Sequence, residues 1–143
     1  MTKEIKTEIT INANPETIWN ILIHQETYPD WNPFIKKLEG KLEIGNKIEV
    51  VIQPENASKM TFKPKILKFE PNKTLQWKGI FLMKGLFDGT HTLKLTDNKN
   101  GTTTFKHTEL FKGVLVKFFN LENTRKGFEK MNSELKRLSE NSK

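Results

Sequence analysis

The fold of this 143-residue chain follows from residues 114–139, VLVKFFNLENTRKGFEKMNSELKRLS. Apolar residues recur there at intervals of three, four or seven, and charged residues take the opposite side. This spacing predicts one amphipathic helix, roughly 38 Å long at about 1.5 Å per residue. A helix of that length can cross a whole sheet and cover its apolar face. The apolar positions are Val114, Phe118, Leu121, Phe128, Met131, Leu135 and Leu138.

The chain before this segment opens with a strand and a short helix. Residues 4–12 largely alternate apolar with polar side chains, and a period of two indicates a half-buried strand. Asn14 can cap a helix, Pro15 suits its first position and Glu16 suits the positive end of the helix dipole. Residues 28–33, YPDWNP, then turn the chain out of that helix.

Six further segments predict strands, because short turn signals containing Gly, Pro or Asn separate them. Consecutive strands joined by short turns favour an antiparallel meander, and Pro64 predicts a bulge or an edge within its strand. The expected fold is therefore α+β: a seven-stranded curved antiparallel sheet wrapped around a long C-terminal helix, with short helices after strand 1. The six strands are expected at residues 34–42, 47–53, 58–70, 74–81, 87–96 and 102–111.

Length and composition fit a single domain over residues 1–143, expected in the cytoplasm. No repeat, linker or low-complexity segment divides the chain, and its length is close to the commonest domain size. No cysteine is present, which excludes disulfides and thiolate chemistry. The charge pattern of residues 1–8 does not fit a signal peptide, and no apolar run approaches the ~20 residues of a membrane span. The oligomeric state stays open between monomer and dimer.

Lysine and arginine outnumber aspartate and glutamate by 24 to 17, which gives a net charge of +7. The lysines are spread from Lys3 to Lys143 with no run longer than two. We therefore expect a solubilising surface and no specific nucleic-acid binding. A nucleic-acid-binding face would instead gather basic residues into a stripe interleaved with exposed aromatic residues.

Five blocks of sequence, in order along nearly the whole chain, resemble one protein family. Residues 11–19, INANPETIW, are similar to the opening of the START-like helix-grip superfamily. Residues 28–35, YPDWNPFI, match a block of its SRPBCC branch, the polyketide cyclase/dehydrase-like proteins. Residues 60–64, 85–91 and 126–132 resemble later blocks of that branch. The resemblance implies a helix-grip fold with an elongated cavity between the sheet and the long helix.

The resemblance also implies a class of function. Members bind lipids, sterols, polyketides or plant hormones, others are cyclases or aromatases, and others assist chaperones. They share no single catalytic motif, so no catalytic residues can be transferred to this chain. We therefore expect binding of a hydrophobic or amphipathic small molecule (lipid-, polyketide- or aromatic-like) rather than catalysis. A cyclase, aromatase or dehydratase and a chaperone-assisting protein-interaction module stay as alternatives.

Large apolar residues are the candidates for lining the cavity, with Trp31 and Phe34 near its entrance. The same residues could pack a closed core, because periodicity does not distinguish an open space from a filled one. Gly127 indicates close packing against a strand or a ligand, since glycine inside a helix costs about 1 kcal/mol relative to alanine. The candidate ligand-binding residues of this kind are Trp31, Phe34, Phe62, Trp77, Phe87, Phe111, Phe119, Phe128 and Met131.

His91, His107 and Glu109 form the one titratable set with plausible geometry. Counting by twos places His91 on the apolar face of its strand, and His107 with Glu109 on that of the next strand, about 4.8 Å away. We expect this set to anchor a polar group of the ligand; it also supplies the catalytic candidates for the alternative enzyme. A structural hydrogen-bonded pair, or histidines at a solvent-exposed mouth, would explain the same pattern. No metal-ligand spacing and no phosphate loop or other cofactor motif is present, so we expect neither metal nor cofactor.

Overall fold

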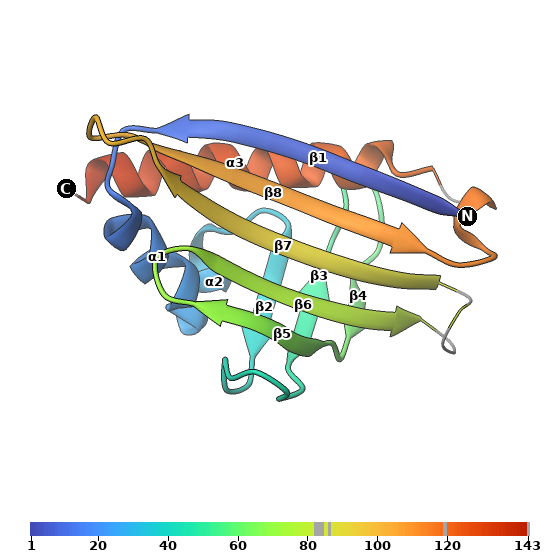
Figure 1. Ribbon diagram of the computed structural model, residues 1–143. Helices are drawn as coiled ribbons and strands as arrows, with labels where there is room; N and C mark the ends of the chain where they lie inside the picture. Colours follow the sequence, from blue (N-terminus) through green and yellow to red (C-terminus); the bar gives the residue numbers. More distant parts are fainter. Residues whose placement is uncertain (82–84, 86, 119, 143) are drawn as a thin grey trace.

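The computed structural model describes residues 1–81, 85, 87–118 and 120–142, and its elements confirm the α+β class (Figure 1). Antiparallel strands precede and follow short helices, and a long helix ends the chain. The elements are β1 (Thr2–Ile11), α1 (Pro15–Ile23), η1 (Gln25–Thr27), α2 (Tyr28–Trp31), β2 (Ile35–Glu39), β3 (Glu49–Ile52), β4 (Met60–Phe62), β5 (Lys65–Glu70), β6 (Thr74–Phe81), β7 (Phe87–Asp97), β8 (Thr103–Lys112), η2 (Val116–Phe118) and α3 (Glu122–Asn141).

The described strands form two sheets rather than the single seven-stranded sheet that the sequence predicts. Five of them follow the order β1-β8-β7-β6-β5, and the other three follow β2-β3-β4. The long strand expected at 58–70 divides at Pro64, which has no N–H to donate to a ladder. As a result β4 pairs with β3, and β5 pairs with β6. An isolated bridge between Lys47 and Lys65 still links the two sheets.

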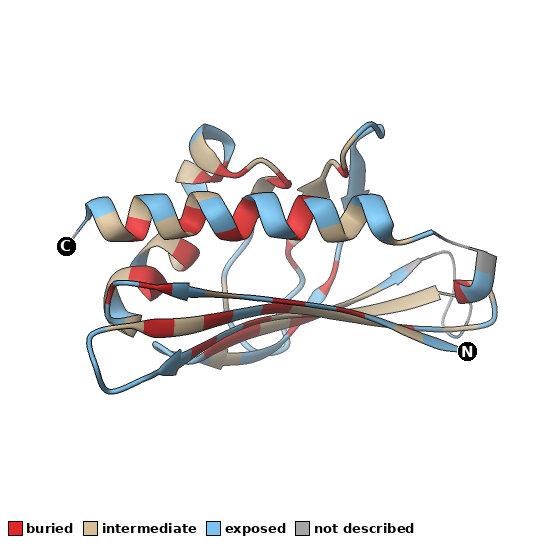
Figure 2. Ribbon diagram, turned by 90° about the horizontal axis from the view of Figure 1, so that it is seen from above, coloured by how far each residue is buried: buried red, intermediate tan, exposed pale blue. Residues whose placement is uncertain are grey.

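Helix α3 lies along the inner face of the five-stranded sheet, as predicted (Figure 2). The three-stranded sheet lies on this same side, so the inner face is covered by both elements (Figures 1 and 2). Phe128, Met131 and Leu135 of α3 are fully buried. The core therefore lies between the sheet and one stripe of the helix, where the amphipathic pattern places it.

The long helix begins eight residues later than the sequence pattern predicts. Among the described residues between 114 and 121, only Val116–Phe118 form a short turn, η2, and Val114 is 60% exposed. The side chain of Asn120 accepts a hydrogen bond from the backbone N–H of Glu122 (3.0 Å), and a local bond of this kind competes with helical pairing. The predicted burial of the Phe118 side chain falls outside what the structure describes.

Two polar side chains turn the chain on either side of the short helices. Asn14 caps α1, as predicted, by accepting a hydrogen bond from the N–H of Thr17 (2.8 Å). Asn32 is buried after α2 and accepts hydrogen bonds from the N–H groups of both Phe34 and Ile35 (2.9 and 2.8 Å). The YPDWNPF segment thus fixes the position at which Phe34 enters the core.

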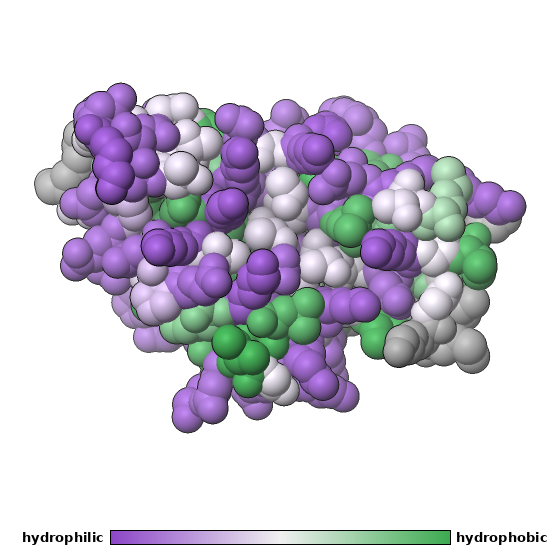
Figure 3. Space-filling model, viewed as in Figure 1, coloured by the Kyte–Doolittle hydropathy of each residue, from purple (hydrophilic) through white to green (hydrophobic). Residues whose placement is uncertain are grey.

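The outer face of the five-stranded sheet is mainly hydrophilic (Figure 3). Along β7 and β8, outward-facing Thr and Lys residues such as Thr92 and Lys106 alternate with buried inward-facing ones. Among the described residues, no helix has both the length and the apolar character needed to cross a membrane.

Candidate functional site

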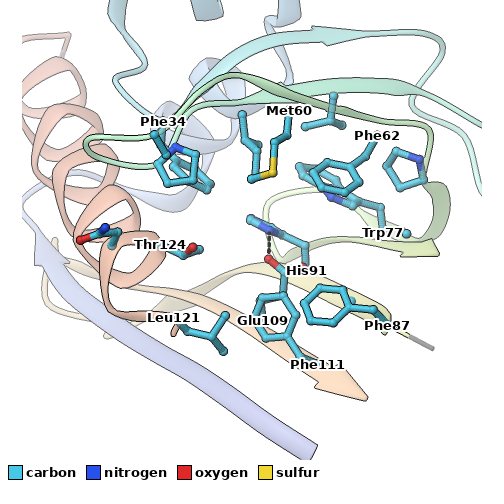
Figure 4. A pocket seen from close by; sticks show the side chains of 18 of the residues that line it. Phe34, Met60, Phe62, Trp77, Phe87, His91, Glu109, Phe111, Leu121 and Thr124 are labelled. Atoms are coloured by element: carbon cyan, nitrogen blue, oxygen red, sulfur yellow. Dashed lines mark hydrogen bonds and ion pairs between the residues drawn. The ribbon is translucent and has the colours of Figure 1, made fainter. Parts of the chain in front are cut away.

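A cavity of about 290 Å³ lies between the two sheets and the first turn of α3. Its walls come from the inner face of β6, β7 and β8, from β3 and β4 opposite, and from residues 120–124 at the helix start. Figure 4 shows the labelled side chains surrounding this space. The predicted residues that line the cavity are Phe34, Phe62, Trp77, Phe87, His91, Glu109 and Phe111.

Four predicted residues lie outside the cavity lining. Trp31 packs edge-on against the Tyr28 ring (centroids 5.3 Å apart) and is not among the residues that line the cavity. Phe128, Met131 and His107 are fully buried behind the wall. Phe119, the remaining candidate, lies outside the described residues.

Several lining residues could not be selected from the sequence. Strands β3 and β4 are short, so their alternation is weak, and α3 starts later than its pattern suggests. Both segments contribute apolar and polar wall residues that were not expected, and β6 and β7 each add a glycine. The unexpected lining residues are Val50, Ile52, Pro54, Ala57, Met60, Pro64, Gly79, Gly89, Asn120, Leu121, Asn123 and Thr124.

Gly127 lets Phe34 approach the backbone of α3. A side chain at position 127 would overlap the Phe34 ring, which also packs edge-on against Phe128 (centroids 5.2 Å apart). The cost of a glycine inside a helix is therefore offset by close packing on this ring. Of the two expected explanations, contact with a neighbouring structural element is the one that the described residues support.

His91 and Glu109 form a directly opposed pair on adjacent strands at the cavity wall (Figure 4). His91 Nδ1 lies 3.1 Å from Glu109 Oε1, and the Glu109 side chain keeps 18% exposure. The indole of Trp77, the partner of His91 on β6, stacks on the imidazole with ring centroids 4.7 Å apart and an interplanar angle of 12°. The pair is thus held on a rigid sheet with one carboxylate edge open to the cavity.

His107 lies behind this pair and connects it to α3. Its Nε2 is 2.8 Å from His91 Nε2, and its Nδ1 is 2.9 Å from Asn132 Oδ1. The ring also stacks on the Phe128 ring, with centroids 3.9 Å apart and an interplanar angle of 6°. Complete burial, and secondly the neighbouring His91, lower the pKa of His107 well below its ordinary value, so the folded protein holds this imidazole neutral.

Two members of this network, Thr7 and Asn132, were not among the sequence candidates. Asn132 Nδ2 donates to Thr7 Oγ1 (2.9 Å), and Thr7 Oγ1 donates to the backbone carbonyl of His107 (2.7 Å). Asn132 lies four residues after Phe128, within the buried stripe of α3. A polar side chain on an apolar helix stripe was the available signal, since buried polar groups need partners.

The described residues contain no group of three or more His, Cys, Asp or Glu side chains that could hold a metal ion. The site therefore offers a mainly apolar cavity with the His91–Glu109 pair on its sheet wall and Asn120, Asn123 and Thr124 at the start of α3. Such an arrangement is typical of small-molecule sites, in which a few polar groups orient a ligand that apolar contacts bind.

Solved structures share this fold over nearly the whole chain. Protein CV1439 from Chromobacterium violaceum matches with a TM-score of 0.72 and 19% identity, over 96% of each chain. Ara h 8.0201 matches with a TM-score of 0.68 and 17% identity, over 97% of this chain and 96% of its own. A norcoclaurine synthase from Thalictrum flavum, solved with dopamine and hydroxybenzaldehyde, matches with a TM-score of 0.71 and 14% identity, over 100% of this chain and 89% of its own.

These identities are low, so the structural matches establish the fold and not a shared ligand. The comparison with curated proteins gave no match. The family model described as "Polyketide cyclase / dehydrase and lipid transport" matches residues 2–142. This match agrees with the five blocks of sequence and with the arrangement of sheet, cavity and long helix. The chain therefore belongs to the polyketide cyclase/dehydrase and lipid transport family, within the START-like helix-grip superfamily.

Proposed function

We propose that this protein, as a single ligand-binding domain, binds a hydrophobic or amphipathic small molecule in the cavity between the sheet and α3. The observation that carries the proposal is the cavity itself, because a filled core would leave no room for a ligand. Aromatic side chains make up much of its wall, and His91 with Glu109 forms a hydrogen-bonded pair there, while Asn120, Asn123 and Thr124 add polar groups at the start of α3. Burying an apolar ligand there gains roughly 25 cal/mol per Å² of apolar surface.

The size of the cavity limits the ligand. At about 290 Å³ it lies just below the range of roughly 300–1,000 Å³ that small-molecule sites occupy. A ligand with one or two rings, or a short acyl chain, fits this volume. A sterol or a long fatty acid would need the walls to separate.

An enzyme acting on such a ligand is the second candidate, because His91 and Glu109 both line the cavity. His91 Nδ1 lies at hydrogen-bond distance (3.1 Å) from Glu109 Oε1. A histidine beside a carboxylate can move a proton during a cyclisation or a dehydration. Conversion of a bound ligand over time, abolished by Glu109→Gln while binding survives, would favour this candidate. The protein-interaction alternative is weaker, since it requires a filled cavity.

The proposal predicts that a neutral fluorescent probe, N-phenyl-1-naphthylamine, binds the protein and that filling the cavity abolishes binding. Gly79 lines the cavity on β6, and a Cβ at this position meets only Pro64 Cβ at 3.7 Å. Gly79→Ile would therefore extend its side chain into the open space without displacing the strand. We expect at least a tenfold loss of probe affinity in a fluorescence titration.

Lys78→Ile is the matched control, because it places the same side chain on the opposite face of β6. This variant should keep the probe affinity of the wild type. Circular dichroism and thermal unfolding of all three proteins would verify that they are folded. Equal probe binding by Gly79→Ile and the wild type would refute the cavity as the binding site.

A further inference from the structure

We propose that the ligand presents a hydroxyl group to Glu109 Oε2, so that the site selects neutral phenols or alcohols over carboxylates and ethers. This inference rests on the proposed function and names the class of molecule that it requires. It follows from the direction of one hydrogen-bond chain that runs from β1 through α3 to the cavity wall. Each link in this chain fixes the direction of the next.

The hydrogen-bond chain starts at the backbone carbonyl of His107, which can only accept. Thr7 Oγ1 lies 2.7 Å from the carbonyl oxygen of His107, so the single hydroxyl proton of Thr7 points there. Thr7 Oγ1 can then only accept from Asn132, 2.9 Å away. This requires the amide nitrogen of Asn132 to face Thr7 and its amide oxygen to face His107.

The two histidines continue in the same direction. Asn132 Oδ1 accepts, so His107 Nδ1, 2.9 Å away, must carry the proton. The neutral imidazole of His107 then has a lone pair on Nε2, which accepts from His91 Nε2–H at 2.8 Å. The proton of a neutral His91 is thereby committed to Nε2, and its Nδ1 is left with a lone pair.

The last link, from His91 Nδ1 to Glu109 Oε1 at 3.1 Å, needs one further proton. Without it, a lone pair would face a carboxylate oxygen. The proton is bound either to Glu109 Oε1, as a carboxylic acid, or to His91 Nδ1, as an imidazolium paired with a carboxylate. In both arrangements the pair as a whole carries no net charge.

Both arrangements leave Glu109 Oε2 as a hydrogen-bond acceptor. Among the described residues this oxygen has no hydrogen-bond partner, while Oε1 is hydrogen-bonded to His91. Oε2 lies over Gly89, where any side chain would overlap it, and both residues line the cavity. The absent side chain of Gly89 therefore makes the space in which this acceptor is presented.

An uncharged pair with an exposed acceptor determines which ligands bind well. A phenol or alcohol donates its O–H to Oε2 while its rings or chain contact the aromatic wall. An ether has no donor, and a carboxylate would place negative oxygens against Oε2 and bury an unpaired charge. Neutral hydroxyl compounds of one or two rings therefore suit both the polarity and the volume of the site.

Three naphthalenes that differ in one group test this selectivity by isothermal titration calorimetry at pH 7. The wild type should bind 2-naphthol about tenfold more tightly than 2-methoxynaphthalene, as expected for one hydrogen bond to a charged or strongly polar group. It should bind 2-naphthoate more weakly than either. In Glu109→Leu, which removes the acceptor, the affinities for 2-naphthol and 2-methoxynaphthalene should become equal.

Glu109→Gln tests the direction of the chain. Without a carboxylate partner His91 is neutral in this variant and keeps its proton on Nε2, so its Nδ1 accepts from the glutamine amide, which leaves the amide oxygen in the position of Oε2. This variant should still prefer 2-naphthol to 2-methoxynaphthalene, by roughly threefold for the weaker neutral acceptor. A reversed preference in Glu109→Gln would show that the chain runs in the opposite direction and would overturn the inference.

The remaining outcomes separate this inference from the proposed function. If all three naphthalenes bind equally, or Glu109→Leu keeps the wild-type preference, the cavity binds ligands but the hydroxyl inference fails. If none of them binds the wild type or the Glu109 variants, the proposed function fails as well.

Discussion

Replacing Phe128 with alanine should lower the free energy of unfolding by about 3–5 kcal/mol. The ring is fully buried and stacks on the His107 imidazole with ring centroids 3.9 Å apart. It also packs edge-on against the Phe34 ring, with centroids 5.2 Å apart. Its removal leaves a void between α3 and the sheet that neither element can close. Urea denaturation of the variant and the wild type measures this loss directly.

Phe69→Ala is the matched control, because it makes the same deletion at a half-buried ring. Phe69 contacts Trp19 only edge-on, with centroids 5.4 Å apart, and lies away from the cavity. Its loss should cost about half as much, in proportion to the apolar area buried. Equal effects of the two deletions would contradict the position of Phe128 at the centre of the core.

The stability of the protein should fall as the pH drops below about 6.5 because His107 stays neutral when folded. Burial and the neighbouring His91 lower the pKa of His107, whereas an unfolded histidine has a pKa of about 6.5. Below that pH the unfolded chain binds a proton that the folded protein does not. The free energy of unfolding contributed by His107 therefore decreases, by roughly 2 kcal/mol between pH 7.5 and pH 5.

His107→Gln isolates this contribution, since glutamine can bond to Asn132 and His91 but does not titrate. The variant should be less stable than the wild type at pH 7.5, and the difference between them should shrink by about 2 kcal/mol at pH 5. Urea denaturation at both pH values provides the comparison. A difference that stays constant or grows towards pH 5 would mean that His107 is charged in the folded protein.

The fold class was predictable because its determinants are local. The period of two in β1, the cap at Asn14 and the apolar stripe of α3 each specify an element without help from distant residues. The division at Pro64 was visible as a break, but not as a change of sheet, because pairing partners are a long-range property. The start of α3 was missed because Val114 continues the helical spacing by chance.

The candidate site was predictable only in part. Alternation placed His91 and Glu109 on inward faces, and the sheet register brings them together as directly opposed residues. The same alternation could not show that His107 is sealed behind them by Phe128 of α3. Whether aromatic residues fill a space or surround it depends on how far apart the two sheets lie, which no periodicity records.

A crystal structure of the protein with saturating 2-naphthol tests the central claim most directly. The ligand should occupy the cavity, with its rings among the aromatic side chains and its oxygen about 3 Å from Glu109 Oε2. An empty cavity, or naphthol bound only on the outer surface, would contradict the account.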